Sequence, residues 1–367
     1  MEAIPPYVIR LFWLIFVFCF GACVGSLLNV VVARLPLEKS LIWPGSRCGS
    51  CLQPIRNWAN IPILSYLILR GKCYSCKSKY SSRYFWVELA TACAFTALFY
   101  ADIMLNIHGL AYVQQSEMEL SFGWVPWRCW VIFGWHATLL SFLIAASLCD
   151  FDGKIIPLPL TMSGTVIGLC GATLFAWPWP NEGLAQPQWP KNAAWYLPEN
   201  ATKLTRGLYN WPLWGPLPDW LRNGSWQLGL LTGLAGAAVG NILMRSIKYI
   251  FEKGLGREAL GLGDADLMMM AGAFLGWQMV IVAFVIGTFA ALFVAVPQVL
   301  FRRDRALPFG PGLSIGIIIC MLAWRWLSPA LTVYFFDWLM LVIVSILFGG
   351  GMFVASMILG LIRPKTE

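Results

Sequence analysis

The sequence predicts an all-α polytopic membrane protein of about eight or nine transmembrane helices, with a small cytosolic four-cysteine insertion that resembles a zinc ribbon. Apolar residues fill 59% of the 367 positions, whereas charged residues fill only 12%. The mean hydropathy of the chain is +0.68. The charged fraction is roughly half that of soluble domains, which is too low to cover a water-soluble globule of this size.

Nine apolar windows predict the membrane-spanning helices. A helix that crosses about 30 Å of hydrocarbon needs about 20 mostly apolar residues. The sixth and eighth windows are short, so we expect them to tilt or to thin the bilayer locally. We expect the first window to be retained, because it is too long for the apolar region of a cleavable signal peptide. The windows are 8–33, 85–105, 127–149, 156–177, 227–247, 265–278, 280–301, 311–327 and 331–362.

Basic residues predict the orientation of these helices. In an alternating arrangement of nine spans, 19 Lys and Arg residues fall on one side and six on the other, with Arg325 near a helix end. Because Lys and Arg are enriched in cytosolic loops, we expect the side with 19 to face the cytosol. This placement accounts for the net charge of +8. No contiguous basic face with stacking aromatic residues is predicted, so we do not expect nucleic-acid binding.

Two long connections differ in character. The segment 35–83 is predicted to be cytosolic and carries the clustered cysteines, whereas the segment 178–226 is predicted to be external. The external segment contains seven Trp and eight Pro residues, which is too many prolines for regular helix. Indole rings favour the headgroup layer, so the simpler interpretation is a membrane-surface lid or packing element. A binding role is the alternative.

The clustered cysteines predict a metal site. Cys48-Gly-Ser-Cys51 and Cys73-Tyr-Ser-Cys76 are two CxxC pairs separated by 21 residues, close to the spacing of a four-cysteine zinc ribbon. A reducing cytosol argues against disulfides, and the repeated spacing argues against unligated thiols. Four thiolates fill all four tetrahedral positions, so we expect the zinc to be structural and the catalytic groups to lie elsewhere.

Two aspartates at the ends of predicted spans are candidate catalytic residues. Asp150 closes the third window, and Asp264 opens the sixth in the sequence Gly261-Leu262-Gly263-Asp264. Both acids are predicted at the cytosolic interface, where helix packing could bring them together. Two close carboxylates can share a proton, so that one activates water and the other protonates the leaving group. Gly261 and Gly263 lack side chains and would let a substrate backbone approach Asp264.

A purely structural interpretation of these acids also fits the sequence. Asp264 could cap the helix that follows it, and Asp150 with Asp152 could form a solvated Asp-Gly turn. The two histidines do not offer another catalytic centre. His136 is roughly 21 Å along the helix from Asp150, so we expect it to be packed or interfacial, and His108 lies on the outer side. A Ser/His/Asp constellation is therefore not predicted.

Several blocks of the sequence resemble the type IV prepilin peptidases, the bifunctional leader peptidases and N-methyltransferases of bacterial pilus and type II secretion systems, which are membrane aspartyl proteases of the GxGD type. The segment Gly21 to Pro36 resembles the first-span block of this family, and Cys48 to Glu88 resembles its paired CxxC region. The Asp150 segment resembles the first catalytic-aspartate block, Gly261 to Asp264 the GxGD block, and Leu307 to Pro311 a late Pro-Phe-Gly-Pro element.

The resemblance implies a function and a site. It implies that Asp150 and Asp264 cleave the leader of prepilin or pseudopilin precursors after a glycine at the cytosolic face of the bacterial inner membrane. It further implies methylation of the new N-terminus with S-adenosylmethionine, although no residues that bind this cofactor can be read from the spacing. A peptidase without methyltransferase activity is one alternative. A non-catalytic membrane scaffold with a structural zinc ribbon is another.

The sequence departs from the family at three places. Leu158 follows Pro157 where the family commonly has Asp, Asp266 stands where a Lys is usual, and Phe85 replaces a proline. Asp152 and Asp266 are therefore rival candidates for the catalytic acids.

The predicted organisation is a first transmembrane helix (1–34), the zinc-binding and methyltransferase-associated segment (35–83), transmembrane helices carrying Asp150 (84–177), the Trp/Pro-rich external loop (178–226), the transmembrane peptidase core with GxGD (227–327) and an extra C-terminal transmembrane helix (328–367).

Overall fold

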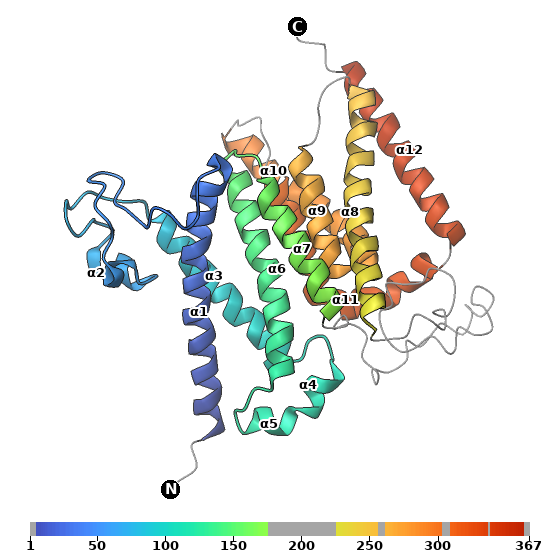
Figure 1. Ribbon diagram of the computed structural model, residues 1–367. Coiled ribbons are helices and arrows are strands. Elements are labelled where there is room, and N and C mark those ends of the chain that lie inside the picture. Colours follow the sequence, from blue (N-terminus) through green and yellow to red (C-terminus); the bar gives the residue numbers. More distant parts are fainter. Residues whose placement is uncertain (1–4, 175–224, 256–260, 303–308, 337, 363–367) are drawn as a thin grey trace. The chain divides into compact units, whose positions relative to one another are not determined.

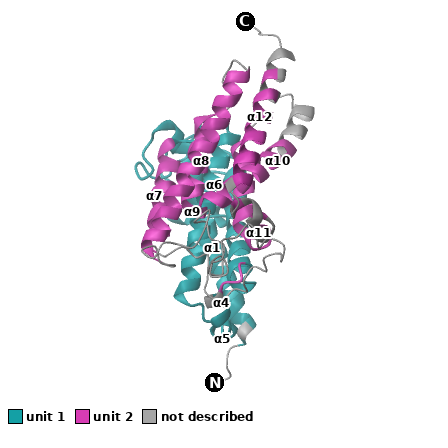
Figure 2. Ribbon diagram, turned by 90° about the vertical axis from the view of Figure 1, so that its right-hand side faces the viewer, with its two compact units in different colours: residues 1–107, 112–157 teal, residues 108–111, 158–367 magenta. Residues whose placement is uncertain are grey.

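The computed structural model describes residues 5–174, 225–255, 261–302, 309–336 and 338–362. Across these ranges the regular elements are helices, and the only β pairing is two isolated antiparallel bridges. The predicted all-α fold class is therefore confirmed. The chain divides into two compact units: residues 1–107 with 112–157 form unit 1, and residues 108–111 with 158–367 form unit 2 (Figure 2).

Each predicted window overlaps a helix in the described part of the chain, although the ninth window, 331–362, also includes the end of the helix that holds the eighth (Figure 1). Among the described residues, five helices contain segments long and apolar enough to cross a membrane: α1, α3, α6, α8 and α11. The bounds are α1 (Pro6–Arg34), α3 (Arg83–Phe99) with the π-helical turn η3 (Tyr100–Met104), α6 (Trp127–Phe151), α7 (Leu158–Leu174), α8 (Trp226–Leu255), α9 (Leu262–Leu275), α10 (Trp277–Arg302), α11 (Gly310–Phe336) and α12 (Trp338–Ile362).

Short helical elements connect these helices. They are η1 (Leu35–Leu37), η2 (Asn57–Asn60), α2 (Leu64–Leu69), α4 (Ala111–Gln115) and α5 (Glu117–Ser121). The Trp/Pro-rich segment predicted over 178–226 lies outside the described residues, except for its last two positions.

The lengths of two helices test the prediction of short spans. Helix α9 has 14 residues, as expected for a short sixth span. Helix α11 has 27 residues, but its segment apolar enough to cross a membrane, Gly310–Leu327, has 18 residues and agrees with the short eighth window. The predicted window stopped before Pro329, but the helix continues through this proline to Phe336. In membrane proteins neighbouring groups can satisfy the backbone positions that a proline frees, so a proline need not end a helix there.

Unit 1 is built around α1, α3 and α6. Gly21 and Gly25 of α1 lie directly against the α3 residues Ala92 and Glu88, where a larger residue would clash with the Cα atoms. These contacts run in opposite order along the two helices, so α1 and α3 are antiparallel. Helices α1 and α6 run in the same direction (Figure 1). The C-terminal ends of α1 and α6 and the N-terminal end of α3 therefore meet at one end of this unit.

In unit 2, glycines bring α7, α8 and α9 close together. Gly240 of α8 lies against the backbone of Met268 in α9, and Gly168 of α7 lies against the side chain of Phe274 near the end of α9. Successive glycines of α8 meet residues of α7 and of α9 in reverse order, so α8 is antiparallel to both, and α7 and α9 are parallel to each other. The beginnings of α7 and α9 therefore lie at the same end of unit 2. Small residues at such contacts are typical of membrane helix packing.

Candidate catalytic and metal-binding sites

Asp150 lies in the last turn of α6, which ends at Phe151. Gly153 follows with a φ of +65°, and its N–H donates to the carbonyl oxygen of Asp150 at 2.9 Å. A residue with positive φ just beyond a helix is a common C-terminal cap, and glycine adopts this conformation without steric cost. Asp150 is half-buried. The turn therefore fixes the backbone at this acid.

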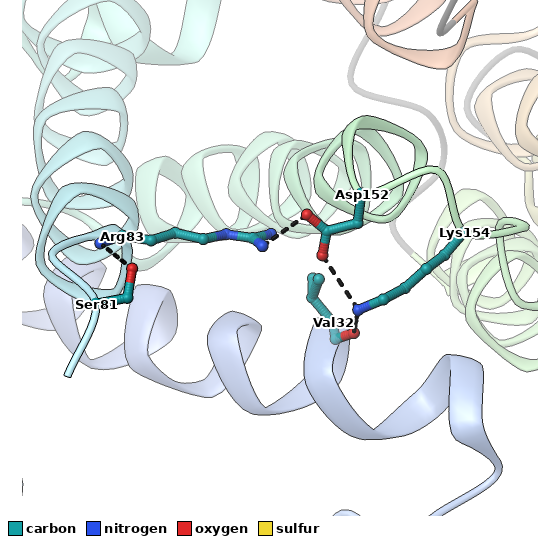
Figure 3. A network of polar contacts seen from close by, with 5 residues as sticks. All are labelled: Val32, Ser81, Arg83, Asp152 and Lys154. Carbon is teal, nitrogen blue, oxygen red and sulfur yellow. Dashed lines mark hydrogen bonds and ion pairs between the residues drawn. The ribbon is translucent and has the colours of Figure 1, made fainter. Parts of the chain in front are cut away.

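Asp152, two positions after Asp150, lies in a network of ion pairs (Figure 3). The guanidinium of Arg83 donates to Asp152 Oδ1 at 2.6 Å, and Lys154 Nζ donates to Asp152 Oδ2 at 3.1 Å. Lys154 Nζ also donates to the carbonyl oxygen of Val32 at 3.3 Å. Partial burial raises the pKa of Asp152, but the hydrogen bonds from Arg83 and Lys154 outweigh it and hold this pKa below its ordinary value. Asp152 is therefore ionised and joins the ends of α1, α3 and α6.

Asp264 lies in the first turn of α9, where the helix dipole favours a negative charge. Its relative exposure is 9%, so the acid is buried. Gly261 occupies the N-cap position, and Asp264 is the third residue of the helix. Gly261 is exposed, and a Cβ added there would lie 3.8 Å from Asp264 Oδ2, whereas Gly263 is buried. Gly261 is thus the uncovered glycine beside the acid.

The two candidate acids belong to different units. Asp150 is in unit 1 and Asp264 is in unit 2. Each lies at a helix end, as the sequence predicts, and the convergence of the two carboxylates stays a prediction.

The four predicted cysteines come together in unit 1 as two knuckles with the same geometry. In the first, Leu52 N–H donates to the carbonyl oxygen of Cys48 at 3.0 Å, and in the second, Lys77 N–H donates to that of Cys73 at 3.0 Å. Leu52 and Lys77 both have a positive φ, at 58° and 61°. Antiparallel bridges close the two turns at equivalent positions, between Arg47 and Pro54 and between Lys72 and Lys79. The repeated spacing therefore produces a repeated fold.

The four thiols fit a tetrahedral metal ion. The Sγ atoms of Cys48, Cys51, Cys73 and Cys76 all lie within 4.8 Å of one another. Those of Cys48 and Cys76 are 3.8 Å apart. Zinc–sulfur bonds of about 2.3 Å in tetrahedral geometry place neighbouring sulfurs about 3.8 Å apart. The cluster thus has the ligand number and the dimensions of a four-cysteine metal site.

The close thiols of this cluster differ in acidity. Hydrogen bonds from the backbone N–H groups of Cys51 and Ser50 lower the pKa of Cys48 to about 6. A backbone hydrogen bond at Gln53 lowers the pKa of Cys51, but burial and the neighbouring thiols raise it to about 11. Four thiolates this close repel one another without a cation, so a bound metal would allow all of them to ionise.

A buried carboxylate anchors the cysteine-containing segment to α3. Glu88 of α3 is 8% exposed, and its Oε2 accepts a hydrogen bond of 2.8 Å from the backbone N–H of Ile63. Ile63 has a φ of +64°, which is unfavourable for a β-branched residue. This hydrogen bond therefore stabilises a strained backbone position next to α2.

His136 is packed inside unit 1, as the sequence predicts. Its Nδ1 lies 2.8 Å from Asp102 Oδ2, and the two side chains are 1% and 0% exposed. Asp102 was not among the site residues predicted from the sequence. An acid within an apolar window was the available signal, because such acids usually have a partner or a function.

The fold and these sites define the class of the protein: over its described residues it is a helical membrane protein with an insertion whose four clustered cysteines could hold a metal ion, and with acids at two helix ends. Two family descriptions match the chain. The bacterial peptidase A24 N-terminal domain matches residues 19–101, and the type IV leader peptidase family matches residues 219–296. The chain belongs to the type IV leader peptidase family. The first range contains the four cysteines and the second contains Asp264, whereas Asp150 falls outside both.

Relatives across the length of the chain carry the name prepilin leader peptidase/N-methyltransferase. The relative from Myxococcus xanthus is 33% identical over 277 residues, which cover 76% of this chain and 60% of the relative. The relative from Pseudomonas putida is 26% identical, covering 82% of this chain and 88% of the relative. The relative from Pseudomonas aeruginosa is 28% identical, covering 84% and 91%. No solved structure matches the chain.

Proposed function

We propose that this protein is a membrane aspartyl endopeptidase that removes the leader of type IV prepilins or pseudopilins and then methylates the new N-terminus. One observation carries the proposal. Asp264 lies buried in the first turn of a helix within the segment that matches the type IV leader peptidase family. The names of the relatives support both activities.

The directions of the helices support Asp150 as the second catalytic acid. Asp150 ends α6, and α7 begins at Leu158 after a short turn. A chain that leaves the membrane at one face must re-enter from that face, so the start of α7 belongs to the face at which Asp150 lies. Within unit 2, α9 begins at the same end as α7. The two acids thus share one membrane face in the proposed enzyme.

At that face one carboxyl group would act as the general base and the other as the general acid in hydrolysis. The ionised carboxylate accepts a proton from water as the water oxygen attacks the carbonyl carbon of the scissile peptide bond. The protonated carboxyl group donates to the carbonyl oxygen, and the amine receives a proton as the C–N bond breaks. Gly261 is exposed next to Asp264 and leaves room for the substrate backbone. The leader is cut after a glycine at the cytosolic face, just before the hydrophobic helix of the precursor.

Two cofactors belong to the proposal. Zinc held by Cys48, Cys51, Cys73 and Cys76 would be structural, because four thiolates leave no open coordination position. It would hold the two knuckles together in a segment with little hydrophobic core. S-adenosylmethionine would supply the methyl group, and we assign no residues to its binding.

The proposed location is the bacterial inner membrane. The apolar helices and the names of the relatives support it. The end of unit 1 where α1 and α6 finish also carries Arg34, Arg83 and Lys154. Basic residues favour the cytosolic side, so this end, with the cysteine-containing segment and Asp150, would face the cytosol.

Co-expression with candidate prepilins, followed by mass analysis of the mature N-terminus, tests both activities. The wild-type protein should yield pilin cut after the glycine and heavier by one methyl group. Asp150→Asn and Asp264→Asn should each abolish cleavage at normal protein levels, and Glu119→Gln, an exposed acid of α5, should leave it unchanged. Full processing by either asparagine variant would refute the catalytic pair. Cleaved but unmethylated pilin would leave the peptidase and exclude the methyltransferase.

A further inference from the structure

The negative charge of Asp152 lies at an unfavourable position relative to the dipole of its own helix, α6. Asp152 is the C-cap residue of this helix, and the C-terminal end of a helix dipole disfavours a carboxylate. Arg83 is the first residue of α3, and the N-terminal end of a helix disfavours a cation. Neither residue stabilises the helix that carries it. Their contact of 2.6 Å compensates both charges and joins the two helices (Figure 3).

Lys154 extends this contact to a third helix. Its ammonium group donates to the carbonyl oxygen of Val32. This carbonyl is one of the last four of α1, which accept no hydrogen bond from an N–H group within the helix. A cation at this position is favoured by the dipole of α1. Asp152 Oδ2 holds the same ammonium at 3.1 Å. The carboxylate of Asp152 is thus the common partner through which α1, α3 and α6 are connected.

Backbone hydrogen bonds link Asp152 to Asp150. The N–H of Asp152 donates to the carbonyl oxygens of Leu148 and Cys149, both at 3.2 Å, and the N–H of Gly153 donates to that of Asp150 at 2.9 Å. Asp150 and Asp152 therefore belong to one hydrogen-bonded turn. A displacement of Asp152 would therefore be expected to disturb the backbone position of Asp150.

We propose that Asp152 is a positioning residue for leader cleavage: held between Arg83 and Lys154, it locks the end of α6 to α1 and α3 and so fixes the place of Asp150. This inference rests on the proposed function. It also removes Asp152 as a rival acid, because both of its oxygens are engaged by cations. A catalytic misplacement of 1 Å can cost about 100-fold in rate, so a residue that only positions Asp150 would have a large effect on turnover.

Steady-state kinetics on a purified prepilin in detergent tests the inference. Asp152→Asn should lower kcat by about 10- to 100-fold and leave KM within about twofold, because Asp152 does not touch the substrate. Arg83→Gln should act in the same way, and Arg83→Lys should recover much of the loss because it keeps the charge. The double variant Arg83→Gln/Asp152→Asn should have the same kcat as Asp152→Asn alone, because both substitutions remove the same contact between Arg83 and Asp152.

An ion pair that connects no two helices provides the matched control. Lys248 and Glu252 are 3.4 Å apart on successive turns of α8, and Glu252→Gln should leave kcat unchanged. An unchanged kcat in Asp152→Asn, or a raised KM with kcat retained, would overturn the inference. If Asp152→Asn does not fold, equal kcat values for Arg83→Lys and Arg83→Gln would overturn it instead. The proposed function fails separately, if wild-type protein does not cleave or if Asp150→Asn still does.

Discussion

Gly236 of α8 and Gly272 of α9 face each other at backbone contact in unit 2. A methyl group added to either glycine would clash with the backbone carbonyl of the other. One turn further along α8, Gly240 makes a similar contact with the backbone of Met268. Helix α9, which carries Asp264, is therefore held against α8 by the close approach of two backbones rather than by interlocking side chains.

Gly272→Ala should separate the two helices and destabilise the protein. Overpacking of this kind costs about 1–3 kcal/mol, and neither backbone can move aside as a flexible side chain would. We expect a lower thermal unfolding midpoint in detergent and slower prepilin cleavage, because α9 shifts and carries Asp264 with it. Differential scanning fluorimetry and a cleavage assay on the same preparation measure both effects.

Gly134→Ala is the matched control for this substitution. Gly134 lies within α6, and a Cβ added there meets nothing within 4 Å. Alanine is the better helix former by about 0.5–1 kcal/mol, so this variant should be as stable as the wild type or slightly more so. If both alanine variants unfolded at the same temperature, the close contact between α8 and α9 would have no special role.

The ion pairs of Asp152 predict how stability depends on pH. The pKa of Asp152 in the folded protein lies below its ordinary value of 3.8, because Arg83 and Lys154 overcome the effect of partial burial. The contribution of this carboxylate to stability is therefore complete above about pH 5 and is lost as the pH falls through the folded-state pKa. The stability gap between wild type and Asp152→Asn should be constant above about pH 5 and shrink below about pH 4.

Thermal unfolding of the two proteins across this pH range measures the gap. The comparison cancels the protonation of the cysteines, which both proteins share. A gap that stays constant down to about pH 2.5 would mean that the carboxylate of Asp152 is not held ionised by its neighbours.

The helices could be predicted from the sequence because crossing a bilayer imposes both a length and an apolar composition. That is why all nine windows overlap helices, and why the short α9 was recognised. The end of α11 was not predicted: the eighth window ends at position 327, whereas the helix continues through Pro329 to Phe336. Packing between helices was not predicted, since it depends on which face each helix turns toward its neighbours, and glycines such as Gly236 carry no hydropathy signal for that.

The site was predictable where one residue or a fixed spacing carries the chemistry. The four cysteines and the positions of Asp150 and Asp264 at helix ends followed from the sequence alone. The contact between Arg83 and Asp152 did not, because the two residues are 69 positions apart and their pairing requires the mutual orientation of α3 and α6. The sequence therefore showed that Asp150 and Asp152 were both candidates for the catalytic acid, but it did not show that Asp152 is held in ion pairs.

The cysteine cluster predicts one zinc ion per purified chain. Cys51→Ser removes a ligand and should lower the zinc content measured by elemental analysis to a small fraction of the wild-type value. Cys93→Ser changes an exposed thiol of α3 outside the cluster and should leave the zinc content unchanged. Equal zinc contents in the two variants would place the metal elsewhere.

Removal of the metal by a chelator should loosen the segment that it folds. The segment 35–83 has few buried residues, so without zinc we expect rapid proteolysis between Arg34 and Arg83. The hydrogen bond from Ile63 to Glu88 and the ring contacts of Tyr66 with Phe85 and of Tyr80 with Tyr84 tie this segment to α3 only near the start of that helix. Resistance to trypsin that returns on adding zinc supports a structural metal, whereas resistance that is unaffected by chelation contradicts it.

Asp102 and His136 predict a large effect on stability deep inside unit 1. Their side chains are buried and 2.8 Å apart, and removing the hydrogen-bond partner of a buried polar group costs about 1–3 kcal/mol. Asp102→Ala should lower the thermal midpoint strongly, and Asp102→Asn, which keeps a hydrogen-bonding oxygen, should lower it less. Since the pair lies about three to four helical turns from Asp150, any folded Asp102→Asn protein should still cleave prepilin. A stable variant with no cleavage would assign this pair a role in the reaction.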